Sequence, residues 1–440
     1  MKNFFINRYL NFFNNSPFTI FFILLLVLPI CFLQFSSFIN FAIIFYTYIF
    51  FIFTPIYFLF KTLSPNHSLV DISFWIYVYV FFGFSGLIQF SSEQIPWINY
   101  YNENLVHKSI MIGICGIIGF IFGRYSIQNL RLPNRNIIIS RIHILFSLSV
   151  CLALILFTTL GFEKIIYPRF LFDLTVKESG YLQILIIRFL KVSLFVCLIS
   201  YLLKHKQNET SSFTLIVICS FMLIYFNPIR SERLSLLMFL TFILLYFVNY
   251  SKKFWMVSLS LGLSFIFPYL DYFRESLSND GFSKQNSYDV ASHFLTGDFD
   301  AFSTIILSIN YIKFNEFSLF KNFFDALLVY IPRAIWVDKP ISSSFLLTND
   351  GSIQFSSIAT NYWAEGYLAL GFIGVFLSLF IIGILVKSIS EQRDGSHFIQ
   401  VIYIFFIPYM IYFLRGDLYS TAFRLIPLIF LTYLVTEKEN

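Results

Sequence analysis

The sequence predicts an all-α protein that spans a membrane many times, and two observations carry this prediction. Of the 440 residues, 58% are hydrophobic and only 12% are charged. A soluble domain of this length lacks the polar surface to cover so many apolar side chains. The apolar residues also gather in runs of roughly 15–25, the length that a helix needs to cross a bilayer.

These runs divide the chain into three parts. About nine apolar segments occupy residues 1–270, a long polar and aromatic interval covers 271–361, and about three further segments occupy 362–440. We therefore expect about 12 transmembrane helices and one long extramembrane loop. The predicted spans are residues 18–35, 38–60, 69–90, 109–123, 142–160, 181–203, 213–227, 233–250, 254–270, 362–386, 398–414 and 418–435.

Basic residues in the loops predict the orientation. Cytoplasmic loops carry an excess of Lys and Arg, and the segment from Arg124 to Arg141 holds four arginines and no acidic residue. Both termini are therefore expected in the cytoplasm and the 271–361 loop outside. Within that loop, residues 301–311 and 319–331 have apolar side chains at helical spacing, which predicts amphipathic helices at the outer interface.

Five arginines fall on the outer side in this topology, where positive charge should be sparse. They are Arg230, Arg233, Arg274, Arg333 and Arg415. Guanidinium groups bind phosphates through a planar fork and stay charged at any accessible pH. The set predicts an anionic ligand, most simply a lipid-linked phosphate or diphosphate. The alternative is that each side chain reaches up to the interface or pairs with a nearby acid.

Further cations are expected to contribute to substrate binding. Arg188 and Lys191 are three residues apart and share one helix face, Arg424 lies at a similar depth in the last span, and Lys339 lies in the long loop. A cation inside the membrane is costly and usually faces a polar cavity. A misplaced span boundary is the alternative.

Acidic residues near the cations are candidates for a general base toward a sugar hydroxyl. They are Asp271, Glu275, Asp338, Glu365 and Asp417, of which Asp271, Glu365 and Asp417 are assigned to the site; each could instead hold an arginine in place. His293 is a further candidate base. Asp298 and Asp300 form an acidic pair of the kind that can hold a metal, but the glycine before them favours a turn and a helix start. We expect no metal and no cofactor.

Aromatic residues within the long loop and directly after it are candidates for stacking on sugar faces. They are Trp336, Tyr362, Trp363 and Tyr367. Anchoring at the membrane interface would explain them equally well. The net charge of +6 is ordinary for a membrane protein and gives no reason to expect a nucleic-acid partner.

Four short motifs carry a resemblance to a known family. RSERLSLL begins at Arg230, IPRAIWVDKP at Ile331, EGYLALGFIGV at Glu365 and LRGD at Leu414. With the many spans, they make roughly residues 227–427 resemble the Wzy-type O-antigen polymerases, also called oligosaccharide repeat unit polymerases. The first half of the chain matches only in being hydrophobic and multi-spanning.

The resemblance implies a membrane glycosyltransferase of the GT-C-like kind in a bacterial inner membrane. Such an enzyme joins repeat units carried on undecaprenyl diphosphate at the outer face, and it depends on extracytoplasmic arginines, here the five named above. It implies a flippase and a chain-length regulator as partners, besides membrane lipid. Two alternatives stay open: an O-antigen ligase of similar fold, and a polysaccharide flippase or other transporter.

Overall fold

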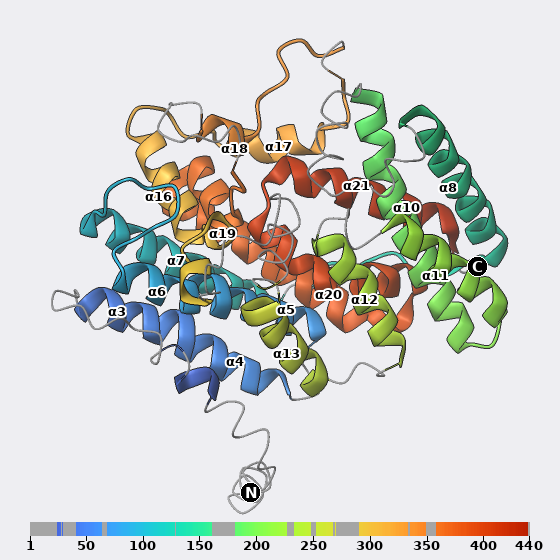
Figure 1. Cartoon of the computed structure of the whole chain (residues 1–440), viewed down its shortest axis with the longest axis horizontal. Coiled ribbons are helices and arrows are strands. Elements are labelled where there is room, and N and C mark those ends of the chain that lie inside the picture. The colour runs from blue at the N-terminus through green and yellow to red at the C-terminus, as the bar shows by residue number, and fades with distance from the viewer. Residues whose placement is uncertain are drawn as a thin grey trace, which may run out of the picture.

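The computed structural model of the chain is a bundle of helices (Figure 1). The structure describes residues 24–27, 29, 41–63, 68–127, 129–160, 181–226, 233–247, 252–266, 269, 290–332, 335–348 and 358–438. In these residues the only sheet is a pair of three-residue strands, β1 (Arg135–Ile137) and β2 (Thr436–Lys438). The predicted all-α class is confirmed for this part of the chain.

Eight helices in the described residues are long and apolar enough to cross a membrane, so the protein is membrane-embedded. Their bounds are Phe41–Thr62 (α3, η1 and α4), Leu69–Ser91 (α5, η2 and α6), Glu103–Arg124 (α7), Ile139–Thr159 (in α8), Leu185–Lys206 (in α10), Tyr362–Gly395 (α19 and η6), His397–Arg415 (α20) and Leu418–Val435 (α21). Each coincides with a predicted span.

The remaining four predicted spans differ. Residues 213–227, 233–250 and 254–270 correspond to the shorter helices α11 (Ser212–Tyr225), α12 (Arg233–Phe247) and α13 (Lys252–Leu261), the last continued by the π-helical turn η4 (Gly262–Ile266). The predicted span 18–35 lies mostly outside the described residues.

The helix Leu69–Ser91 forms the centre of the bundle, because its whole length is buried. Helix α5 (Leu69–Tyr77) packs against α4 (Thr54–Thr62), α13 and α20. Close packing needs small residues: a Cβ on Gly86 would lie 2.6 Å from the ring of Phe302. This span contacts protein rather than lipid, which allows it to carry buried polar side chains such as Ser73 and Gln89.

One end of the bundle collects the basic loop and the C-terminal segment. Strand β1 pairs antiparallel with β2, with Arg135 opposite Lys438. Leu130 N donates to Ser388 Oγ at 3.0 Å, and Leu132 N donates to Gln392 Oε1 at 3.0 Å. The loop after α7, the end of α19 and the C-terminal strand therefore lie on one side, as the predicted topology requires. That this side is cytoplasmic stays a prediction.

The predicted span 362–386 is not one straight helix. Helix α19 (Tyr362–Gln392) has non-helical backbone angles at Leu370 and Gly371, and Gly371 has φ 61°. A Cβ on Gly366 would lie 2.9 Å from Val375 Cα and 2.7 Å from Ser378 Oγ, whereas twelve residues of straight helix span about 18 Å. The chain therefore folds back on itself. Residues 362–369 form a short inner helix, and residues 372–392 form the crossing helix.

The long loop also differs from its prediction. Helix α16 (Ala301–Ile312) is buried from Ala301 to Ile309 and packs between α7 and α19, so residues 301–311 do not lie on the outer interface. The segment AFSTIILSI is mostly apolar, and the hydroxyls of Thr304 and Ser308 can be buried because they donate to the backbone carbonyls of Ala301 and Ile305. The second predicted helix, 319–331, is limited to α17 (Lys321–Leu327). Figure 1 shows both helices with α18 (Ser343–Leu346) near α19.

Candidate functional site

The candidate site is built around the turn from Arg415 to Leu418, which joins α20 to α21. Arg415 is the last residue of α20, and Leu418 is the first of α21. Two other helices begin next to this turn: α16, with Asp300 at its N-cap, and α19, with Asn361 at its N-cap. The Asn361 Nδ2 donates to Ala301 O at 2.6 Å and so ties these two helix starts together.

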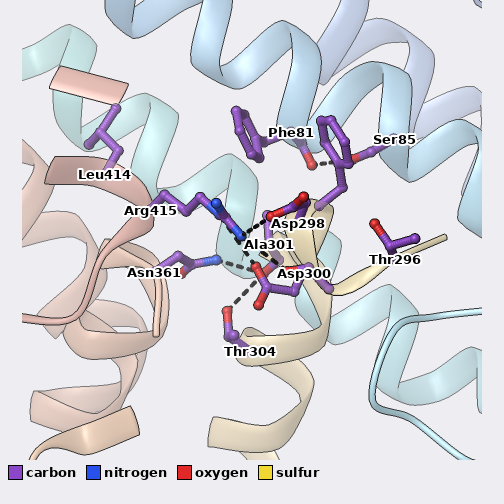
Figure 2. A network of polar contacts seen from close by, with 12 residues as sticks. Phe81, Ser85, Thr296, Asp298, Asp300, Ala301, Thr304, Asn361, Leu414 and Arg415 are labelled. Atoms are coloured by element: carbon purple, nitrogen blue, oxygen red, sulfur yellow. Dashed lines mark hydrogen bonds and ion pairs between the residues drawn. The ribbon is translucent and has the colours of Figure 1, made fainter. Parts of the chain in front are cut away.

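Arg415 lies beside the acidic pair that the sequence assigned to a turn (Figure 2). Its Nη2 donates to Asp298 Oδ1 at 3.3 Å and to Gly297 O at 3.1 Å, and its Nε is 3.9 Å from Asp300 Oδ1. The helix start at this pair is confirmed, since the 3-10 turn η5 (Gly297–Phe299) leads into α16. No Lys or Arg stands beside this pair in the sequence, but the fold brings Arg415 to it from 117 residues away.

The two acids have different surroundings. Asp300 is 2% exposed and accepts a hydrogen bond from Trp97 Nε1 at 3.3 Å. Burial raises the pKa of Asp300 to about 6, although the nearby Arg415 acts to lower it. Asp298 is 16% exposed, and its Oδ2 lies 3.8 Å from His293 Nε2. The turn therefore places a guanidinium, two carboxylates and an imidazole within one cluster.

The segment from Phe294 to Phe299 is held in place by Gln89 of α6 (Ser85–Ser91). The Gln89 Nε2 donates to Phe294 O at 2.9 Å and to Phe299 O at 2.8 Å. Sequence reasoning did not single out Gln89 or Trp97. The sequence did offer a signal for Gln89, because its amide lies inside the apolar run 69–90. An uncharged polar side chain in a membrane span usually has a protein partner.

Glu365 lies in the short inner helix of α19 and is completely buried. Its carboxylate accepts hydrogen bonds from Asn322 Nδ2 at 2.8 Å, Ser343 Oγ at 2.7 Å and the backbone N of Leu418 at 3.3 Å. It thereby links α17, α18 and α21. These three donors occupy the carboxylate, so its contacts favour a structural role over that of a general base.

Asp417 has the role of a helix cap. Its Oδ1 accepts a hydrogen bond from Ser420 N at 2.8 Å, and its Oδ2 accepts one from Ser420 Oγ at 2.8 Å. An aspartate at this position also interacts favourably with the helix dipole. The Arg-Gly-Asp sequence of the turn thus ends one helix and starts the next.

Two cations of the membrane-spanning helices lie next to the same end of α21. The guanidinium of Arg188, from α10, stacks over the ring of Phe423 at 4.3 Å, and that of Arg424 stacks over Tyr412 at 3.9 Å. Tyr330 also packs against Phe423. The two rings are 5.0 Å apart, and the Tyr330 hydroxyl donates to Phe423 O. Stacking uses the face of a guanidinium and directs its N–H edge sideways.

Several predicted binding residues have packing roles in the structure. The Lys339 ammonium is buried and donates to Val329 O at 2.6 Å and Ile331 O at 2.9 Å. Trp363 is fully buried and its Nε1 donates to Gly113 O at 3.1 Å. Tyr362 and Tyr367 are buried as well. These contacts favour the structural alternative for all four.

Two further predicted residues are only partly buried. Trp336 belongs to a turn in which its N donates to Pro332 O, and Lys191 lies in α10 one turn beyond Arg188. Among the other predicted residues, Arg230, Arg274, Arg333 and Asp271 lie outside the described residues, and Arg233 is described only as the first residue of α12. The structure therefore brings together Arg415, Glu365 and Asp417 at one turn, and places Arg188 of α10 against α21, the helix that carries Arg424.

The described residues contain no group of three or more His, Cys, Asp and Glu side chains able to hold a metal ion. Comparison with models of known protein families, with curated protein sequences and with solved structures gave no match to this chain.

Proposed function

We propose that this protein is a membrane glycosyltransferase that polymerises oligosaccharide repeat units linked to undecaprenyl diphosphate, at the outer face of a bacterial inner membrane. The observation that carries the proposal is the pair Arg188 and Arg424, two guanidiniums on membrane-spanning helices, of which the first stacks on Phe423 and the second on Tyr412. A charged side chain within a membrane-spanning helix is energetically costly, and such residues usually have a function. The motifs shared with the O-antigen polymerases supply the substrate class.

Transfer of a glycan from a diphosphate carrier to a sugar hydroxyl has two chemical requirements. The departing diphosphate must be stabilised, and the acceptor hydroxyl must lose its proton. In our proposal, the N–H edges of Arg188 and Arg424 bind the diphosphate oxygens in a bidentate way. Arg415 forms ion pairs with Asp298 and Asp300, and its buried Nε has no hydrogen-bond partner among the described residues, so this N–H is a further donor for the substrate in our proposal.

The base is drawn from the cluster at Arg415 rather than from Glu365 or Asp417. Glu365 has three donors on its carboxylate, and Asp417 caps α21. His293 Nε2 lies 3.8 Å from Asp298 Oδ2, so a carboxylate stands next to this candidate base, beyond hydrogen-bond distance. We propose that His293 accepts the proton of the acceptor sugar and that Asp298 positions the imidazole.

Purified protein with lipid-linked repeat units tests the proposal. Arg188→Ala and Arg424→Ala should each lower polymer formation at least tenfold, equal to about 1.4 kcal/mol of transition-state stabilisation, and lysine should restore little of it. Arg131→Ala is the matched control, because Arg131 is an exposed arginine in the loop at the opposite end of the bundle. Polymer of normal length and amount from both alanine variants would contradict the proposal.

The surface glycan of a strain that lacks the protein separates the alternatives. Single repeat units on the lipid A core are expected for a polymerase. Free polymer left on its carrier would indicate a ligase, and lipid-linked units retained on the cytoplasmic side would indicate a flippase.

His293→Gln should block polymer formation while the protein still inserts in the membrane.

A further inference from the structure

A cavity of about 290 Å³ lies at the end of the bundle opposite to Arg415. It opens between the last turn of α10 and the first turns of α20, next to the 3-10 turn η6 (Arg393–Gly395). Helix α20 begins next to this cavity at His397 and ends at Arg415, eighteen residues later, or about 27 Å along its axis. The cavity is therefore distinct from the site proposed above.

The rim of the cavity is positively charged. Lys206, the last residue of α10, and Arg393 both line it, together with the amides Gln207 and Gln400. Lys252, the first residue of α13, is close enough to interact electrostatically with Arg393. Among the described residues that line the cavity, the one acid is Asp394, which pairs with Arg393 but is 85% exposed.

Arg393 is held in position for a ligand by an aromatic residue. Its Nη1 donates to Tyr403 Oη at 3.2 Å, and its guanidinium lies 5.4 Å from the centre of the Tyr403 ring. The first turn of α20, which carries Gln400, adds the positive end of a nineteen-residue helix dipole. Together these groups favour an anion with several oxygen atoms.

The wall of the cavity changes character with depth. Leu203 lies one helical turn before Lys206 on α10, and Ile404 lies one turn beyond Gln400 on α20. Both apolar residues are therefore nearer the membrane centre than the charged rim. A small soluble anion would make no favourable contact with these apolar residues. A phospholipid can place its phosphate at the charged rim and its acyl chains against the apolar wall.

We propose that this cavity binds the phosphate headgroup of an anionic membrane phospholipid, with Lys206 and Arg393 as the cationic contacts. A basic pocket between transmembrane helices at the headgroup level is a common form of lipid recognition. The bound headgroup ties the end of α10 to the turn between α19 and α20. It stabilises the folded protein by mass action, in proportion to the logarithm of lipid concentration.

Thermal unfolding of the purified full chain in detergent tests this. Phosphatidylglycerol should raise the unfolding temperature more than phosphatidylcholine does, and inorganic phosphate should leave it unchanged. In Lys206→Ala/Arg393→Ala the apparent affinity for phosphatidylglycerol should fall at least tenfold. The control Lys313→Ala/Lys321→Ala removes two positive charges from exposed positions at the end of α16 and the start of α17, and should keep wild-type affinity.

Three results would overturn the proposal. Equal stabilisation by the two lipids would show that no anion is recognised. Protection by inorganic phosphate equal to that by phosphatidylglycerol would assign the cavity to a soluble anion. Unchanged affinity in the double variant would remove Lys206 and Arg393 from the contact. Lys206→Gln changes only an exposed side chain, so it gives the same answer if the double variant fails to fold.

Discussion

Arg124 and Asp71 form an almost completely buried ion pair that joins α7 to α5. Arg124 Nε donates to Asp71 Oδ1 at 2.8 Å and Nη2 donates to Asp71 Oδ2 at 3.1 Å, and the side chains are 7% and 1% exposed. The same carboxylate accepts hydrogen bonds from Ser68 N and Oγ in a capping box at the start of α5. The pair fixes the ends of two central helices at the side of the basic loop.

Breaking this pair should destabilise the protein strongly. Arg124→Ala leaves the Asp71 carboxylate buried without its countercharge, which typically costs about 3–5 kcal/mol. Thermal unfolding in detergent measures the loss. The control is Arg141→Ala, because the Arg141–Glu437 pair is 41% and 59% exposed and pairs of this kind contribute about 0–1 kcal/mol. Equal effects of the two substitutions would show that burial of the first pair is irrelevant.

The corner in α19 should depend on Gly371. Its φ of 61° and ψ of −141° lie in a region that side chains disfavour, so Gly371→Ala is expected to cost about 1–3 kcal/mol. Gly366→Ala should destabilise through a different cause, the contact of its Cβ with Val375 and Ser378. Gly395→Ala is the control, since no atom lies within 4 Å of the added Cβ. Unfolding temperatures unchanged from wild type at both 366 and 371 would contradict the corner.

Asp300 should make stability depend on pH. Burial raises its pKa from 3.8 to about 6, so the folded protein holds this proton more tightly than the unfolded chain does. Stability therefore falls as pH rises from about 4 to about 6, by roughly 2–3 kcal/mol in total. Asp300→Asn lacks this contribution. The stability of wild type relative to this variant should decrease over that interval and level off above it; a constant difference from pH 4 to pH 7 would contradict the prediction.

The predicted orientation can be measured at two exposed loops. A reporter that is active only outside the cytoplasm should give signal when inserted at Asn315, between α16 and α17, and none at Asn208, between α10 and α11. The physical reason is the excess of arginine between Arg124 and Arg141, which keeps that side in the cytoplasm. The reverse pattern would place the Arg415 cluster inside and would remove the basis for an extracytoplasmic reaction.

The sequence by itself determined the class of the protein and the position of its long helices. The predicted span 69–90 coincides with the helix Leu69–Ser91, and 418–435 coincides with Leu418–Val435. This works because the requirement to satisfy backbone hydrogen bonds in lipid acts on each segment separately. The helix start at Asp300 was also predictable, because glycine and aspartate favour turns through their local backbone preferences.

Only the tertiary structure decided which segments touch protein instead of lipid. An apolar segment has the same composition whether it contacts lipid or protein. The burial of α16 and of Leu69–Ser91 within the protein could therefore not be predicted from the sequence. The corner at Gly371 depends on the fit of Gly366 against Val375. The contact of Arg415 with Asp298 joins residues that are 117 positions apart in the sequence. Such a contact depends on how the helices pack, and no local sequence pattern specifies it.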